Sequence, residues 1–174
     1  MRNVIALSAT ALVLAACGSQ PPAPEQNPSG VESRTPGSVS TPVAQGGFDP
    51  ISVAGLKDPR SPLSKRSIHF DLDSFVIKPE YQSLLAAHAK FLAANGSYKM
   101  LIQGNGDERG SREYNLSLGQ NRANAIKKAL ALLGVAEAQT ESVSLGEEKP
   151  VCAEQTEECW AQNRRGDMLY TGEF

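Results

Sequence analysis

Residues 104–122 read GNGDERGSREYNLSLGQNR, and this stretch decides the fold that we expect. The preceding residues, YKMLIQ at 98–103, are typical of a central strand. The following residues have the apolar spacing of a helix, which we predict over residues 114–133 with Gly134 as its stop. Asp107 therefore lies in a glycine-flanked loop, whereas Arg122 lies on or beside the buried face of the helix.

This arrangement places one anion and one cation on two different elements. A carboxylate at Asp107 can bind an ammonium group, and the planar guanidinium of Arg122 can bind a carboxylate through two parallel hydrogen bonds. A ligand that carries both charges would suit such a pair. The alternative is that the two side chains pair with each other, since loop acids often pair with helix arginines. The residues alone leave both interpretations open.

Outward from this stretch, the apolar pattern predicts the other elements. Ile68 and Phe70 alternate with polar residues, which indicates a half-buried strand. The expected order is a strand at 68–70, a helix from 79 to 95, a strand at 98–103, a helix at 114–133, a strand at 142–145, an acidic loop at 146–159 and a strand at 165–170. This order predicts an α+β fold, a βαβαββ sandwich with the helices packed on one face of a mixed four-stranded sheet.

The two histidines are interpreted as structural. His69 alternates with the core residues of its strand, so we interpret it as a solvent-facing residue rather than a ligand contact. His88 lies on the apolar stripe of the first helix, so we interpret it as a core histidine rather than a catalytic one.

The N-terminus has the pattern of an export signal. Arg2 precedes an apolar run over residues 4–16, which is shorter than the roughly 20 residues of a membrane-spanning helix. The sequence LAAC at 14–17 resembles a bacterial lipobox, so we predict removal of residues 1–16 and lipidation of Cys17. Acyl chains there would hold the protein on a membrane. The resemblance to bacterial lipoproteins implies the outer membrane, facing the periplasm, because Gly18 rather than aspartate follows the cysteine. A plain signal peptide followed by an unrelated cysteine is the alternative.

Residues 17–64 are rich in proline, serine and glycine, and such a segment buries too little apolar surface to offset its ordering entropy. We predict a lipidated flexible tether over residues 17–64 and one folded domain over residues 65–174. The tether contains one apolar cluster, which either packs on the domain or makes no contact: Phe48, Ile51, Val53 and Leu56.

Composition argues against several functions. A net charge of −2 gives no basic surface for nucleic acid. Gly104 and Gly106 fail as a dinucleotide loop because Arg109 stands where the third glycine is needed. No nucleophile with a neighbouring base is recognisable, so we expect no enzyme activity and no cofactor.

Cys152 and Cys159 are the two cysteines that remain after Cys17, and we predict that they form a disulfide, as is usual in an exported protein. A metal site is the weaker alternative, because the chain has only two histidines.

Four motifs together resemble the OmpA-like peptidoglycan-binding domain family. They are FDLDS at 70–74, PEY at 79–81, the long run from 104 to 125 and NRR at 163–165. The resemblance implies non-covalent binding of the meso-diaminopimelate side chain of the peptidoglycan stem peptide, with Asp107 and Arg122 at its two charged ends. It also implies a pocket lined by further residues, namely Phe70, Asp71, Asn115, Leu118 and Arg165.

The same resemblance implies partners and a role. Peptidoglycan and the propeller protein TolB are the implied partners, and a link between outer membrane and cell wall within the Tol-Pal system is the implied role in envelope integrity and cell division. Three positions depart from the family pattern: Asn105 replaces the usual histidine, Gly106 replaces alanine or threonine, and Gly166 weakens the last strand. The alternative function is a protein-interaction module for TolB or another periplasmic partner, with weak or lost wall binding.

Overall fold

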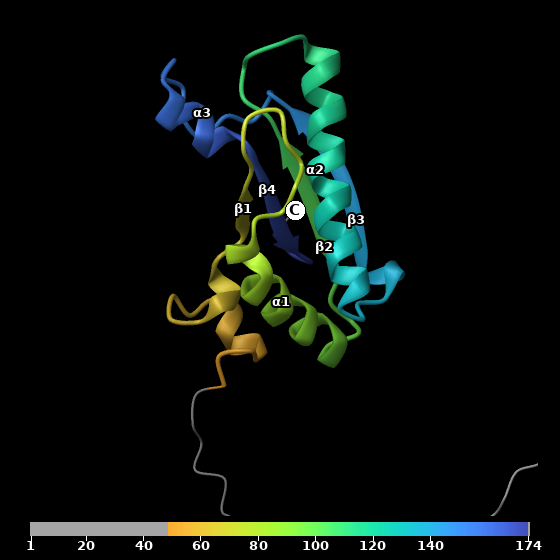
Figure 1. The fold of residues 1–174 in the computed structure, drawn as a ribbon. Coiled ribbons are helices and arrows are strands. Elements are labelled where there is room, and N and C mark those ends of the chain that lie inside the picture. The colour runs from red at the N-terminus through yellow and green to blue at the C-terminus, as the bar shows by residue number, and fades with distance from the viewer. Residues whose placement is uncertain (1–48, 174) are drawn as a thin grey trace, which may run out of the picture. The chain divides into compact units, whose positions relative to one another are not determined.

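The computed structural model describes residues 49–173 (Figure 1). The predicted signal peptide at 1–16, the lipidation site Cys17 and the tether up to residue 48 lie outside these described residues. Within residues 49–173, no helix combines the length and the apolar character needed to cross a membrane.

A four-stranded mixed sheet forms the centre of the domain. Its strands are β1 (Ser67–His69), β2 (Met100–Asn105), β3 (Thr140–Gly146) and β4 (Arg165–Tyr170). The order across the sheet is β1-β4-β2-β3, with β4 antiparallel to both of its neighbours and β2 parallel to β3. A parallel pair requires a long crossover, and the helix α2 (Arg112–Leu132) supplies it. The predicted α+β sandwich is confirmed.

Two helices lie over one face of the sheet, α1 (Gln82–Ala94) and α2 (Figure 1). Their apolar stripes pack on side chains of the strands, as the predicted periodicity requires. The fully buried members of this core include Ile68, Leu85, Phe91, Ile102, Ile126, Leu130 and Met168. Helix α2 begins at Arg112, two residues earlier than predicted, because the hydroxyl of Ser111 accepts a hydrogen bond from the backbone N–H of Tyr114.

The core continues N-terminal to the predicted boundary. Leu63 is fully buried, and Ile51 and Leu56 pack against the core beside two short 3-10 turns, η1 (Val53–Leu56) and η2 (Pro62–Ser64). The folded part therefore begins before residue 65, and the last residues assigned to the flexible tether belong to the domain. For Ile51 and Leu56, the predicted alternative of packing on the domain is the one observed, whereas the burial of Leu63 was not predicted.

The segment predicted as an acidic loop contains a further helix, α3 (Glu157–Asn163). It was missed because its seven residues are too few for a helical apolar pattern. Thr156 caps its N-terminus by accepting a hydrogen bond from the backbone of Cys159. The predicted disulfide is present, and it joins Cys152 to Cys159 with their Cα atoms 5.2 Å apart.

Both histidines lie where the sequence predicts. His88 is fully buried; its Nε2 donates to the carbonyl of Lys65, and its Nδ1 accepts from the hydroxyl of Tyr170. Burial lowers the pKa of His88 to about 4, so the side chain is neutral at physiological pH. His69 lies on the face of β1 opposite to the core and is half-buried beside Tyr81.

Candidate functional site

Two glycines bring α2 against β2 and so position the site. A Cβ atom at Gly104 would lie only 1.8 Å from the carbonyl oxygen of Gly119, and a Cβ at Gly119 would lie 2.8 Å from the carbonyl oxygen of Gly104. Only glycine permits this approach of two backbones. As a result, the loop after β2, which carries Asp107, lies beside the turn of α2 that carries Arg122.

Arg122 is a buried cation, with 0% of its surface exposed. Its guanidinium donates three hydrogen bonds to backbone carbonyls: Nε to Ser74 at 2.9 Å, Nη1 to Asn105 at 2.8 Å and Nη2 to Asp71 at 3.2 Å. Burial lowers the pKa of Arg122 to about 10, which leaves it charged at neutral pH. The acceptors are carbonyl dipoles rather than a carboxylate, and they occupy three of the five N–H groups.

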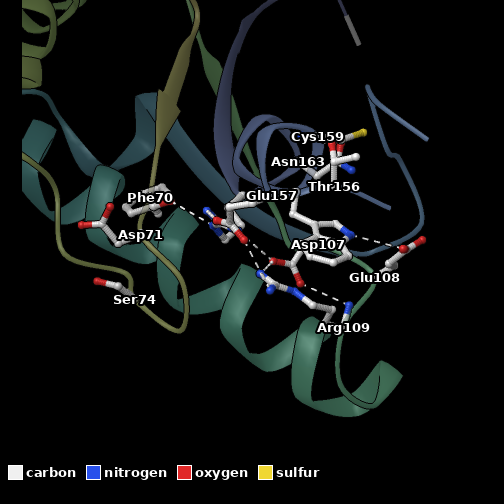
Figure 2. A network of polar contacts seen from close by, with 12 residues as sticks. Phe70, Asp71, Ser74, Asp107, Glu108, Arg109, Thr156, Glu157, Cys159 and Asn163 are labelled. Carbon is white, nitrogen blue, oxygen red and sulfur yellow. Dashed lines mark hydrogen bonds and ion pairs between the residues drawn. The ribbon is translucent and has the colours of Figure 1, made fainter. Parts of the chain in front are cut away.

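Asp107 is a buried anion, 5% exposed, and two other arginines bind it (Figure 2). Its Oδ2 accepts from Nη2 of Arg109 at 2.8 Å and from Nη1 of Arg164 at 3.1 Å. Burial by itself raises the pKa of the Asp107 carboxyl, but the hydrogen bonds from Arg109 and Arg164 outweigh it and hold this pKa below its usual value. The alternative in which Asp107 pairs with Arg122 is therefore wrong, because Asp107 pairs with these two arginines.

Asp107 and Arg122 do line one cleft, and Asn115 and Leu118 line it with them. The remaining lining residues, absent from the predicted set, are Leu72, Asp73, Arg109, Tyr114 and Arg164. The cleft volume is about 40 Å³, far below the roughly 300–1,000 Å³ of typical ligand pockets. The site is thus nearly closed, and an amino-acid side chain can enter only if a lining residue moves.

Two lining residues stabilise the closed form. Asn115 is buried on α2, and its amide donates to the carbonyl of Arg109 and to the carboxylate of Glu147. The hydroxyl of Tyr114 donates to the carboxylate of Asp73, which bridges the cleft to the loop after β1. Both α2 and the loops at its N-terminal end therefore contribute to the walls.

Three predicted lining residues lie elsewhere. Phe70 is a core residue whose ring lies 5.4 Å from the Arg122 guanidinium, and the exposed carboxylate of Asp71 pairs with Lys78 at 2.7 Å. Arg165 points away from the cleft and pairs with Asp167 at 2.9 Å. Arg164, the residue that follows α3, lines the cleft in its place.

Two of the three positions that depart from the family pattern have local explanations. Asn105 is buried, and its amide donates to the carboxylate of Asp167 on the neighbouring strand, outside the cleft. At Gly166, an added Cβ would lie 2.4 Å from Cδ1 of Ile126. The side chain of Ile126 therefore occupies the space that a larger residue would need, and β4 keeps its pairing with β1 and β2.

Among residues 49–173, no group of three or more His, Cys, Asp or Glu side chains could hold a metal ion.

Comparison with known proteins gives a consistent result. The model of the OmpA family matches residues 69–164. A peptidoglycan-associated lipoprotein of Pseudomonas putida is 49% identical over 102 residues, which cover 59% of this chain and 61% of that protein. A protein of the same name from Pseudomonas aeruginosa is 40% identical over 141 residues, which cover 76% of this chain and 83% of that protein.

Solved structures agree with the sequence relatives. The crystal structure of the peptidoglycan-associated lipoprotein from Burkholderia pseudomallei has 56% sequence identity and a TM-score of 0.65, and the match covers 66% of this chain and 98% of that one. The C-terminal domain of Helicobacter pylori MotB has 20% identity and a TM-score of 0.57, over 62% of this chain and 84% of that one. At that identity the MotB likeness concerns the fold alone.

Proposed function

This chain belongs to the OmpA family, and from that premise we propose that it is an outer-membrane lipoprotein that binds peptidoglycan without a covalent bond. In this proposal the folded domain binds the diaminopimelate of the stem peptide, and a lipid at Cys17 holds the protein in the outer membrane, facing the periplasm. The protein would thus link the outer membrane to the cell wall. The names of its relatives support this role.

One observation carries the proposal: a buried arginine without a carboxylate among its hydrogen-bond acceptors lies in the same cleft as a buried aspartate. The free end of diaminopimelate bears an ammonium and a carboxylate on one carbon. The carboxylate would bind the two remaining N–H groups of Arg122, which gives a charge-assisted, forked interaction. The ammonium would bind Asp107. A ligand with only one of these charges would form only one of the two charge-assisted interactions.

The wider role also belongs to the proposal. Family membership supports a place in the Tol-Pal system, with TolB as a protein partner and a function in envelope integrity and cell division. In this proposal the site binds and holds a ligand, and we propose no catalytic step.

A second candidate function is a protein-interaction module. Its support is the small volume of the cleft together with three exposed apolar side chains in the loop after β1, namely Leu72, Phe75 and Val76. Leu72 also lines the cleft, so one surface could serve a protein partner and the wall ligand. Pull-down of TolB compared with retention on purified peptidoglycan would separate the two functions.

The sharpest test of wall binding changes the ligand rather than the protein, because Arg122 also holds three segments of backbone. Two stem peptides are titrated by calorimetry, one with diaminopimelate and one with lysine, which keeps the ammonium and lacks the carboxylate. Loss of a charge-assisted hydrogen bond costs about 1.5–3 kcal/mol, so the lysine peptide should bind roughly 10- to 100-fold more weakly. Equal affinities for the two peptides would show that Arg122 does not bind the carboxylate of the ligand.

A further inference from the structure

We propose that Arg109 is a displaceable occupant of the binding site: it covers Asp107 when the site is empty, and the ammonium of the ligand takes its place. In this view, Glu157 and Trp160 of α3 retain Arg109 after it leaves the carboxylate. The inference deepens the proposed binding of diaminopimelate and depends on it. It makes Arg109 the residue that sets the affinity of the site.

The two arginines on Asp107 are held very differently. The Arg164 side chain is 6% exposed and donates to the carbonyl of Phe70 at 3.3 Å, to Asp107 at 3.1 Å and to Glu157 at 2.6 Å. It is a fixed part of the domain. The Arg109 side chain is 35% exposed, and its buried Nε has no hydrogen-bond partner among residues 49–173. An unsatisfied buried donor makes the covered state of Arg109 less favourable, so Arg109 is the easier cation to displace.

The charge balance at the site favours such a displacement. Asp107 and Glu157 carry two negative charges, and the guanidinium groups of Arg109 and Arg164 already pair with both carboxylates. A ligand ammonium added to this arrangement would place three cations around one carboxylate, and like charges at such distances repel each other. Exchange of Arg109 for the ammonium keeps two cations on Asp107. It also opens a cleft that is otherwise too small for the ligand.

Helix α3 provides a second position for the displaced side chain. The Arg109 guanidinium lies 4.1 Å from the centre of the Trp160 ring, and its Nη1 lies 3.4 Å from the carboxylate of Glu157. The indole N–H of Trp160 donates to Glu108 at 3.2 Å, which fixes the ring. Arg109 can thus leave Asp107 and keep both a cation–π contact and an ion pair.

The disulfide and Asn163 hold α3 in place for this role. The side chain of Asn163 accepts from the backbone N–H of Val151 and of Cys152 and donates to the carbonyl of Cys152. The bond between Cys152 and Cys159 braces the same turn. A seven-residue helix is unstable alone, so these contacts are what present Trp160 to Arg109.

The test uses the purified full-length protein and the diaminopimelate stem peptide. Trp160 is the only tryptophan in the chain. Its fluorescence reports how the Arg109 guanidinium lies over the ring, a geometry that changes when Arg109 leaves Asp107, while calorimetry reports binding. In the wild-type protein, the Trp160 emission should change as the peptide is added, and the midpoint of this change should fall at the same peptide concentration as the midpoint of the calorimetric titration. Arg109→Gln removes the competing cation, so this variant should bind about two- to five-fold more tightly. It should also bind without the change in emission.

Two further variants control the interpretation. Arg112→Gln alters an exposed arginine that pairs with Glu148 outside the cleft, and it should change neither affinity nor emission. Arg109→Lys keeps a cation on Asp107 and should restore an affinity close to that of the wild type, which a merely structural role of residue 109 would not predict.

The outcomes are distinct. Equal or weaker binding by Arg109→Gln, or binding to the wild type without a change in Trp160 emission, would overturn the inference and leave the proposed function standing. Absence of binding heat in the wild-type protein would overturn the proposed function and this inference with it.

Discussion

Replacement of Gly104 by alanine should separate α2 from β2 and disrupt the site without touching any charged residue. The new Cβ would lie 1.8 Å from the carbonyl oxygen of Gly119, whereas ordinary contact begins at 3.4 Å, so the two backbones must part by about 1.6 Å. The obstacle is backbone, which cannot rotate away. Overpacking of a core costs typically about 1–3 kcal/mol, and we expect the upper end of this range or more.

Urea unfolding followed by circular dichroism measures this cost, and a loss of about 3 kcal/mol corresponds to a decrease in melting temperature of about 10 °C. Gly96→Ala is the matched control, because an added Cβ there meets no atom within 4 Å. It should change stability by less than about 0.5 kcal/mol. Binding of the stem peptide should also weaken in Gly104→Ala, since Asp107 and Arg122 move apart. Equal unfolding midpoints for the two variants would refute the close approach of α2 and β2.

Three other predictions follow from buried groups. Asp107→Asn leaves Arg164 with Glu157 as its remaining carboxylate, and it should lower the free energy of unfolding in urea by about 3 kcal/mol. An unchanged unfolding midpoint would contradict the buried ion pair. Replacing both Cys152 and Cys159 by serine should lower the free energy of unfolding by about 2–3 kcal/mol and should speed backbone hydrogen exchange in α3. Unchanged exchange rates in α3 would show that the disulfide does not stabilise this helix. The folded protein binds a proton at His88 only near pH 4, but the unfolded chain binds it near 6.5. Stability should therefore fall by up to about 3 kcal/mol from pH 6.5 to 4, and His88→Gln should flatten this decrease.

Much of the fold could be predicted because local patterns determine it. Alternation at Ile68 and Phe70 identifies β1 and its buried face, and the apolar stripe of α2 identifies the side that carries Arg122. Both patterns depend only on the period of the element. The pair of cysteines remaining after Cys17 likewise indicates the disulfide between nearby positions of one loop.

Most of the features that the sequence did not reveal depend on contacts between distant segments. Asp107 pairs with Arg164, which reaches it only through the pairing of β4 in the sheet. Its other partner, Arg109, is only two residues away, but it lies in a loop that has no period from which the contact could be predicted. Leu63 lies in a proline-rich segment, and its burial requires the completed core. Composition and periodicity contain no information on such partners, so five of the nine residues that line the cleft were missed.

The pairing of β1 with β4 has a consequence for how the chain acquires its structure. Ser67 lies opposite Asp167, and the Arg66 side chain pairs with Glu173, so the first strand of the domain meets its partner only at the far end of the sequence. A nascent chain that emerges from its N-terminus cannot close this sheet until nearly all of the domain is available. Such high contact order predicts slow, late and concerted folding, and a chain truncated before residue 165 would expose an unpaired edge at which molecules could associate.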